Sequence, residues 1–149
     1  MSWAGNLLIG KKIRSLFHQK EQAPSSKRLR SRAVVLSQEE YDFVDGKVAE
    51  WVREKSYRLP DPTVELVARR MGVESAQLYR YSQLRFGEDF RSWRTRLRIQ
   101  DAQEQLLAEP GTSASTIGRR VGFNDRSNFN RHFREITGYS PAQWRSLPR

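Results

Sequence analysis

The chain of 149 residues contains no cysteine and only two histidines, His18 and His132. The absence of cysteine excludes disulfides, thiolate metal sites and cysteine nucleophiles, and it fits a reducing compartment. Because the two histidines stand far apart, a zinc site or a histidine-based catalytic triad has almost no residues to draw on. No carboxylate pair or nucleophile–base pair follows a motif either. We therefore expect no enzyme, no metal and no cofactor.

Long apolar stretches are also missing. No run of about 18 apolar residues occurs, so the sequence predicts no membrane span. The N-terminus differs from a secretory signal, because the apolar stretch Leu7-Leu8-Ile9 is too short and precedes the positive charges. The length suits one domain or two very small lobes with a modest core.

Positive charge is abundant and unevenly distributed. The formal net charge is +10 and the pI is about 10.5. Residues 1–35 carry a net charge of +7, residues 36–109 one of −2, and residues 110–149 one of +5. An excess of arginine over acid favours a polyanionic partner, which is either nucleic acid or an anionic membrane surface.

Residues 1–35 are predicted to be a basic amphipathic segment followed by a linker. Residues 1–20 place apolar side chains on one helical stripe among lysines and arginines, whereas residues 21–33 are rich in Pro, Ser and Arg. Two interpretations stay open for residues 1–33: docking on a membrane surface or a partner protein, or a leader without a role of its own. The basic tract Lys27–Arg32 is either a phosphate contact or a solvated tail.

An extra N-terminal helix is predicted within residues 36–58. Ser37 and Glu40 have the spacing of a capping box, and apolar residues recur at three- and four-residue steps after them. The next helix is predicted to start with Asp61 as its N-cap and Pro62 at its first position. Short helices are expected over 64–71, 75–84 and 113–121. The buried side of a long helix over about 88–108 is marked by Phe90, Trp93, Leu97, Ala102, Leu106 and Leu107.

Residues 117–144 have the pattern of a short helix, a turn and a second helix. Gly122 suits the positive φ of a tight turn, and Asp125 is a good N-cap for the second helix. Phe129, Phe133 and Ile136 give that helix one apolar face. Its outer face carries Ser127, Arg131 and Arg134, with Asn130 on the flank. Two interpretations fit this spacing: a recognition helix for the DNA major groove, and an ordinary amphipathic helix with a solvated face.

The earlier residues 66–87 repeat this pattern. Val67–Val73 aligns with Ile117–Phe123, and Leu78, Arg80 and Gly87 align with Phe129, Arg131 and Gly138. A duplicated helix-turn-helix explains the match. The helix between the copies, with about 20 residues, is roughly 30 Å long. Successive major-groove segments on one side of a duplex are about 34 Å apart, so such a rod can place both helices in adjacent segments.

Several motifs in residues 60–147 are more specific than this repeat. In the linking helix they are Arg98, Ala102, Leu106 and Leu107; in the second unit they are Ile117, Val121, Gly122, Phe123, Asp125, Phe129, Arg131, Phe133, Arg134, Gly138, Ser140, Pro141, Trp144 and Arg145. In these residues the chain resembles the DNA-binding domain of AraC-type bacterial transcription regulators. Gly118 replaces the usual Ala of that pattern.

The resemblance implies an all-α fold in which a long linking helix joins two helix-turn-helix lobes, preceded by an extra helix and a basic N-terminal tail. Residues 59–149 would be the DNA-binding domain. Its first helix-turn-helix would span about 62–86, its linking helix about 88–108, and its second helix-turn-helix about 113–137. The first lobe departs from the family pattern, with Ser82 where Phe is usual and Gln83 where a basic residue is usual. A shortened helix, looser packing or weaker DNA contact would follow, with Tyr81, Leu84 or Phe86 as candidates to fill the gap.

The resemblance also implies sequence-specific binding to double-stranded DNA in the cytoplasm, at the nucleoid, with RNA polymerase as a further candidate partner. The candidate base-reading residues are Ala76, Gln77, Tyr79, Arg80, Arg126, Ser127, Asn128, Asn130 and Arg131. Arginine and asparagine are the side chains that pair bidentately with guanine and adenine edges. For Arg131, an intramolecular packing or ion-pair role competes with a base contact.

The candidate phosphate contacts are Arg119, Arg120, Arg134 and Ser140. His132 is expected to be partly exposed and without a special role. The alternative function is an adaptor that acts through residues 1–33.

Overall fold

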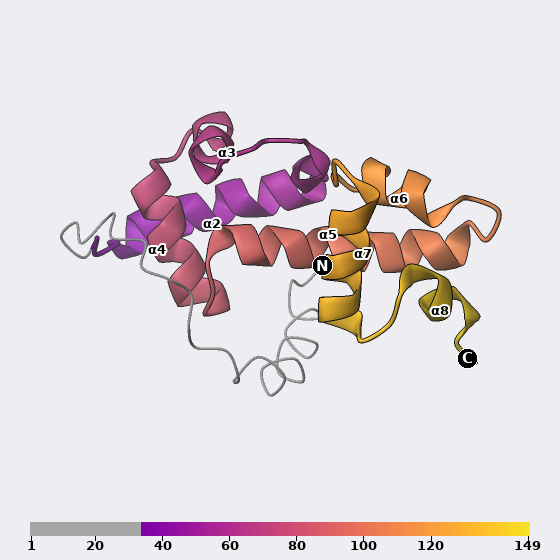
Figure 1. The fold of residues 1–149 in the computed structure, drawn as a ribbon. Helices are drawn as coiled ribbons and strands as arrows, with labels where there is room; N and C mark the ends of the chain where they lie inside the picture. The colour runs from indigo at the N-terminus through magenta and orange to yellow at the C-terminus, as the bar shows by residue number, and fades with distance from the viewer. Residues whose placement is uncertain (1–33) are drawn as a thin grey trace. The chain divides into compact units, whose positions relative to one another are not determined.

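The computed structural model describes residues 34–149, and the predictions for residues 1–33 lie outside that range (Figure 1). The described part is helical throughout and contains no strand. Its elements, in chain order, are α2 (Gln38–Arg53), the 3-10 turn η2 (Ser56–Arg58), α3 (Val64–Met71), α4 (Ser75–Phe86), α5 (Phe90–Ala108), α6 (Ala114–Arg120), α7 (Arg126–Thr137) and α8 (Pro141–Ser146). The predicted all-α arrangement of two helix-turn-helix lobes on a linking helix is thereby confirmed.

Side-chain caps fix where most of these helices begin. The predicted capping box of α2 is present, because the Ser37 hydroxyl accepts from the Glu40 amide and the Glu40 carboxylate accepts from the Ser37 amide. Asp125 caps α7 as predicted, through a 2.7 Å bond from the Asn128 amide. Each such cap satisfies backbone donors that a helix start leaves without partners.

The range of α3 was predicted correctly, but its N-cap was predicted wrongly. Its N-cap is Thr63, whose hydroxyl accepts from the Leu66 amide, and both Asp61 and Pro62 precede the helix. The Asp61 side chain is buried and forms an ion pair with Arg70 at 3.0 Å, and its carbonyl accepts from Arg94. Asp61 therefore holds tertiary contacts in place of the local cap that its sequence context predicts.

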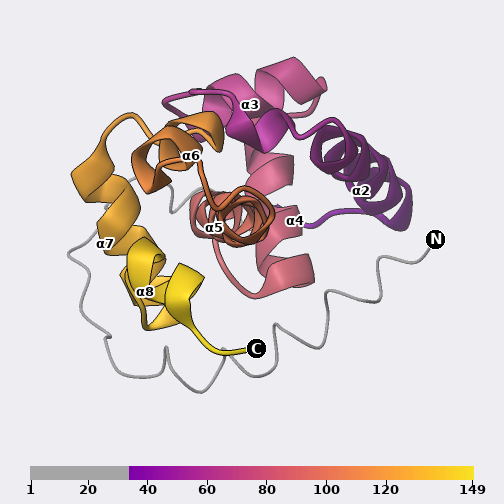
Figure 2. The ribbon, with the colours of Figure 1, turned by 90° about the vertical axis from the view of Figure 1, so that its right-hand side faces the viewer.

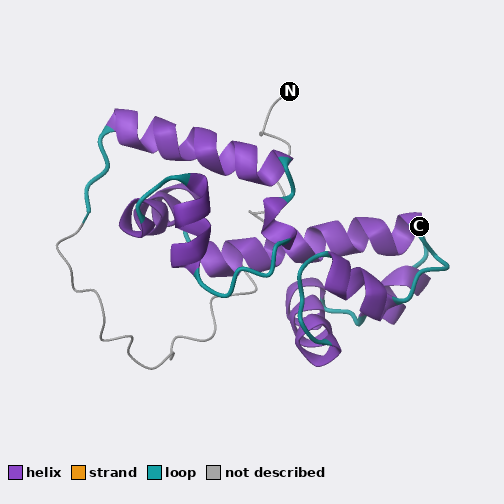
Figure 3. Ribbon diagram, turned by 90° about the horizontal axis from the view of Figure 1, so that it is seen from above, coloured by secondary structure: helices purple, strands orange, loops and turns teal. Residues whose placement is uncertain are grey.

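The apolar side chains form two cores, one for each lobe, and α5 contributes to both. Figure 2 looks along α5 and shows α7 on one side of it and α4 with α2 on the other; Figure 3 shows the same arrangement from above. Phe90 and Trp93, near the start of α5, pack in the first core, whereas Ile99, Ala102 and Leu106 pack in the second. Leu107, predicted to be buried, is 38% exposed, because it lies beyond the stripe that faces the second lobe.

A buried polar network fastens α5 to the segment that precedes α3. Asp101 of α5 accepts two hydrogen bonds from Arg58 and one of 3.0 Å from the Tyr57 hydroxyl. Arg98, also on α5, donates to the carbonyls of Tyr57 at 2.6 Å and Leu59 at 2.7 Å. Because Asp101 and Arg98 are buried, Arg58 is half-buried and all three are bonded at several points, they fix the orientation of the first lobe on α5.

Gly122 brings the turn of the second lobe against the same network. Its φ is +110°, as the sequence predicted, and a Cβ there would lie 2.7 Å from both the Arg98 Nε and the Arg58 carbonyl oxygen. Only glycine fits this close approach. The turn before α7 is thus held against the side chain that also binds the first lobe.

Candidate nucleic-acid interface

The second helix-turn-helix presents α7 as a helix with one buried and one polar face. Phe129 and Phe133 are buried in the second core, and Gly138 ends the helix with a φ of +80°. Ser127, Arg131 and Arg134 are exposed, and Asn130 is half-buried, as the predicted faces require. The polar side chains on the outer face suit contacts with base edges and phosphates in a major groove.

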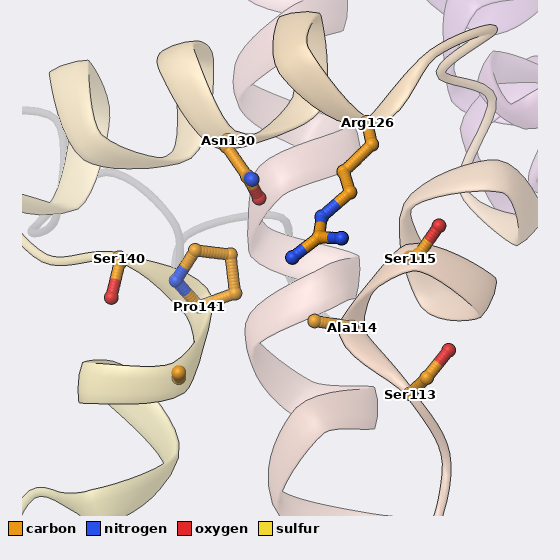
Figure 4. A pocket seen from close by; sticks show the side chains of 8 residues that line it. Ser113, Ala114, Ser115, Arg126, Asn130, Ser140 and Pro141 are labelled. Carbon is orange, nitrogen blue, oxygen red and sulfur yellow. The ribbon is translucent and has the colours of Figure 1, made fainter.

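Arg126 and Asn130 share a hollow in front of α7. This hollow has a volume of about 500 Å³, and its wall also includes residues from the starts of α6 and α8: Ser113, Ala114, Ser115, Ser140, Pro141 and Ala142. Figure 4 shows the Arg126 guanidinium extending over the hollow and the Asn130 amide pointing into it from the next turn. Neither side chain has a hydrogen-bond partner among residues 34–149. Both are therefore available to a ligand.

The side chains of Asn128 and Arg131 are hydrogen-bonded to each other, so neither is as available as Arg126 or Asn130. The Arg131 guanidinium donates to the Asn128 side-chain oxygen at 2.7 Å and forms an ion pair with Glu135 at 3.2 Å. Of the two roles considered for Arg131, the structure thus shows the intramolecular one. An exposed ion pair of this kind contributes at most about 1 kcal/mol, so DNA can compete for the arginine.

His132 lies next to this pair and is half-buried, as expected. Its ring is tilted against that of Phe123, with centroids 5.9 Å apart, and its Nδ1 is 3.3 Å from the Glu135 carboxylate. Burial and the positive charge of Arg131 lower the pKa of His132, while Glu135 opposes that shift. The imidazole is therefore mostly neutral near pH 7.

The candidate phosphate contacts differ in how far they are engaged. Arg119 and Arg134 are exposed and form no ion pair with any described residue. Arg120 instead donates to Glu109 and Gln105, both at 2.7 Å, and this hydrogen bond lowers the pKa of Glu109. Ser140 is the N-cap of α8, and its hydroxyl accepts from the Gln143 amide. Arg119 and Arg134 are thus the better-placed contacts.

The first lobe presents α4 in a similar way but with fewer free polar groups. Ala76 and Tyr79 are exposed, the latter by 59%, and Arg80 is half-buried. Gln77 is already used at both ends of its amide: the oxygen accepts from the Glu74 amide and the nitrogen donates to Glu40 of α2. Adenine recognition needs both ends of a glutamine amide, so Gln77 is a poorer base reader than its position suggests.

Ser82 does not shorten the first recognition helix. Both α4 and α7 contain 12 residues, and the buried Ser82 hydroxyl donates to the Leu78 carbonyl. Of the three candidates for the missing phenyl ring, Tyr81 is fully buried and Phe86 stacks on Trp93 with centroids 4.0 Å apart, whereas Leu84 is 52% exposed. Two aromatic rings and the neighbouring α2 thus complete the first core.

Sequence reasoning missed the residues that support these helices from a distance. Arg58 and Asp101 stand 43 positions apart, and nothing local in either segment signals their pairing. Arg94 belongs to the same group, because it is only 6% exposed and donates to the Asp61 carbonyl. A signal did exist for the wall of the hollow, since Ser113 follows the helix-stopping Pro110-Gly111 and caps α6.

Known proteins share this arrangement. A family model described as a helix-turn-helix domain matches residues 67–146, more than half of the chain. The chain is 31% identical over 105 residues to the arabinose operon regulatory protein of Escherichia coli (strain K12), covering 69% of this chain and 36% of that protein. The identity to the Salmonella typhimurium protein of the same name is 29% over 117 residues, covering 77% and 41%. The chain thus spans about two fifths of the length of these relatives.

Among solved structures, the C-terminal domain of AraT, a response regulator from Geobacillus stearothermophilus, superposes with a TM-score of 0.59 at 27% identity. That match covers 75% of this chain and 87% of the other. The two helix-turn-helix units therefore have counterparts in solved structures as well as in sequence.

Proposed function

Because the chain belongs to the AraC-type helix-turn-helix family of DNA-binding transcription regulators, we propose that it is a sequence-specific, double-stranded DNA-binding transcription factor that places α4 and α7 in adjacent major-groove segments. The observation that carries this proposal is the pair of helix-turn-helix units on one rigid helix. With 19 residues, α5 is about 28 Å long, close to the roughly 34 Å between successive major-groove segments. Figure 1 shows α4 and α7 crossing α5 in roughly the same direction.

In the second lobe, the contacts with base edges are assigned to Arg126, Ser127 and Asn130. Arg126 and Asn130 are the two side chains of α7 that line the hollow in front of it, and neither has a partner within the described residues. A free guanidinium suits the two acceptors of guanine, and a free amide suits adenine. Asn128 and Arg131 would join them only after exchanging their mutual hydrogen bond for bonds to DNA.

In the first lobe, Ala76, Tyr79 and Arg80 would face the bases, while Gln77 caps its own helix. Ala76 and Tyr79 offer a methyl group and an aromatic ring, which suit apolar contact with thymine methyl groups. Arg119 and Arg134 would contact phosphates in the second lobe, with weaker contributions from Arg120 and Ser140. The two lobes therefore contribute unequally, and α7 carries most of the sequence preference.

The proposal includes a location and further partners. Binding to chromosomal DNA places the protein at the nucleoid in the cytoplasm, and RNA polymerase is a candidate partner there. The family is not enzymatic, so no catalytic activity is assigned. Among residues 34–149 no helix is long and apolar enough to cross a membrane. The alternative, an adaptor that docks on a membrane or a partner protein, depends on residues 1–33.

The proposal is tested by selecting bound sequences from a pool of randomised duplex DNA. The enriched site is then footprinted. We expect enrichment of one sequence and protection of two major-groove segments on one side of the duplex. Equal affinity for every duplex would contradict sequence-specific reading. Protection of a single segment would contradict the two-lobe arrangement and leave α7 as the sole reader.

A further inference from the structure

A second, smaller hollow lies where the two lobes meet on α5. Its volume is about 140 Å³, and its wall is mostly polar. The residues that matter for its chemistry are Arg91, Arg94, Arg98, Asn124, Asn128 and His132. They come from the first half of α5, the turn before α7 and the first two turns of α7. The turn of the second helix-turn-helix unit and the first half of α7 therefore border this hollow.

The wall of this hollow carries an excess of positive charge. Arg94 and Arg98 are buried, while Arg91 and Asn124 are exposed and form the open side. One carboxylate, that of Asp61, also lines the hollow: its Oδ1 is paired with Arg70 at 3.0 Å, and its buried Oδ2 has no hydrogen-bond partner among residues 34–149. Three arginines therefore outnumber the single carboxylate in the wall, and Asp61 compensates only part of their charge. Buried charge of one sign is costly unless an opposite charge compensates it.

Arg94 has donor groups that no described residue uses. Arg94 is only 6% exposed. One terminal nitrogen of its guanidinium donates to the Asp61 carbonyl, whereas its Nε has no hydrogen-bond partner among residues 34–149. Burial lowers the pKa of both Arg94 and Arg98, and Arg94 adds to the shift of Arg98, while the Asp61 carboxylate opposes both shifts. A buried donor without an acceptor is a costly arrangement that a bound acceptor would relieve.

We propose that the hollow between the lobes binds the phosphoryl group of a ligand, with Arg91 and Arg94 as its cationic partners and Asn128 as a neutral donor. The volume is below the range of roughly 300–1,000 Å³ that is typical for whole small-molecule ligands, and it suits a single tetrahedral anion. Arginine is the residue of choice for phosphate, because its planar fork binds two oxygens at once.

Two sources could supply this phosphoryl group: the DNA backbone or a free phosphate. The position favours the backbone, because Asn124 and Asn128 flank the start of α7, where a backbone strand passes a helix that enters the major groove. With this source, the inference rests on the proposed function and adds a contact between the two groove segments. With a free phosphate, the hollow is a ligand site that stands without DNA binding.

The first arm of the test uses inorganic phosphate and the full-length chain. Phosphate is titrated against chloride at matched ionic strength while the NMR signal of His132 is followed, with a His18→Gln variant to assign the two histidines. Phosphate bound beside the ring would raise the pKa of His132 and shift its signal to saturation. Arg91→Gln, which removes an exposed charge without a described partner, should weaken this binding roughly tenfold. Arg53→Gln, on the exposed side of α2, is the matched control.

The second arm uses the duplex obtained by selection, with one neutral methylphosphonate placed at each backbone position in turn. At one position between the two groove segments, the wild-type affinity should fall roughly tenfold, and Arg91→Gln should abolish most of that effect. The slope of log K against log salt should also fall by about 0.9 in Arg91→Gln. Arg53→Gln should behave as the wild type in both measurements.

The outcomes separate this inference from the proposed function. Effects in both arms identify the backbone as the source, and an effect on His132 alone identifies a free phosphate. A protein that selects a duplex sequence but shows neither effect overturns the phosphoryl site and leaves the proposed function intact. A protein that binds no duplex but shows a saturating His132 shift overturns the proposed function and leaves the site.

Discussion

Single residues on α7 differ most in whether they already have partners. Arg126 and Asn130 face the hollow without hydrogen bonds to other described side chains, whereas Arg131 is bonded to Asn128 and Glu135. A side chain without a partner can form a hydrogen bond to a base at no loss, but a side chain with a partner must first break its intramolecular hydrogen bond. The polar face of α7 is therefore uneven in what it can contribute to sequence preference.

The first prediction concerns Asn130. Asn130→Ala should cost about 1–3 kcal/mol on the preferred site and relax the preference at one base pair. Arg119→Ala is the matched comparison, because it should weaken binding to all sequences alike as a phosphate contact. Affinities for the selected duplex and its single-base variants would distinguish them. An Asn130→Ala protein that keeps the full base preference would remove this residue from the reading face.

The second prediction concerns Gly122. Gly122→Ala should destabilise the fold by about 2 kcal/mol or more, since alanine is strained at φ +110° and its Cβ would collide with Arg98 and the Arg58 carbonyl. Gly72→Ala is the control: its φ is +73° and the space around it is open, so the cost should be about 1 kcal/mol. Urea unfolding measures both. Equal losses would show that the close approach at Gly122 adds nothing.

The third prediction concerns Tyr57 at alkaline pH. Burial and the neighbouring Asp101 raise the pKa of Tyr57 from 10.0 to about 12. The folded protein then holds a proton that the unfolded chain loses, so the free energy of unfolding should fall between pH about 10 and about 12, by up to about 2 kcal/mol. Stability measured across this range should decline less in Tyr57→Phe. The same decline in the variant would exclude Tyr57 as its cause.

Among the helices, α2 has the clearest supporting role. The Tyr81 hydroxyl of α4 donates to Asp45 of α2 at 2.5 Å, and Arg85 forms an ion pair with the same carboxylate at 3.7 Å. Burial and Asp45 together raise the pKa of Tyr81, so the phenol stays protonated and donates. By these bonds α2 orients the helix that is proposed to read the first groove segment.

The fourth prediction follows from these bonds. Asp45→Ala should lower the free energy of unfolding by about 1–3 kcal/mol, because the buried Tyr81 hydroxyl loses its acceptor. Asp42→Ala, one turn earlier and exposed, removes only a bond from Gln38 and should cost much less. Chemical denaturation compares the two variants. Similar small losses in both would show that α2 does not hold α4 through Asp45.

What the sequence could predict at this scale was set by local signals. The caps Ser37 and Asp125 and the positive φ of Gly122 depend on residues within a few positions of each other, so they were predicted correctly. Asp61 has the same kind of local context, but its carboxylate binds Arg70 and Thr63 caps the helix. Whether a side chain such as Asp61 caps the next helix or binds a more distant residue depends on the tertiary fold. The spacing of residues in the sequence does not encode that fold.

The same limit applies to the candidate interface. The outer face of α7 follows from its helical period, so its exposed residues were predicted. The engagement of Gln77 with Glu40 was not, because the two residues stand 37 positions apart and meet only when α2 packs on α4. The Tyr81 and Phe86 rings around Ser82 depend equally on packing against α2 and α5.

For the molecule as a whole, the central feature is that one helix belongs to both lobes. The network around Arg98 and Asp101 ties the first lobe to α5, and Gly122 brings the second lobe against the same arginine. The two recognition helices are therefore held at a fixed separation, which a flexible connection would not give. A fixed separation requires a fixed spacing between the two DNA segments that they are proposed to read.

The fifth prediction tests this requirement most directly. Base pairs are inserted between the two halves of the selected site, and the affinity of the full-length protein is measured for each duplex. About five base pairs, half a helical turn, should weaken binding at least roughly tenfold, because the second segment turns to the far side. About ten base pairs should not restore it, since α5 spans only about 28 Å. An affinity unchanged by either insertion would contradict two recognition helices held on one rigid helix.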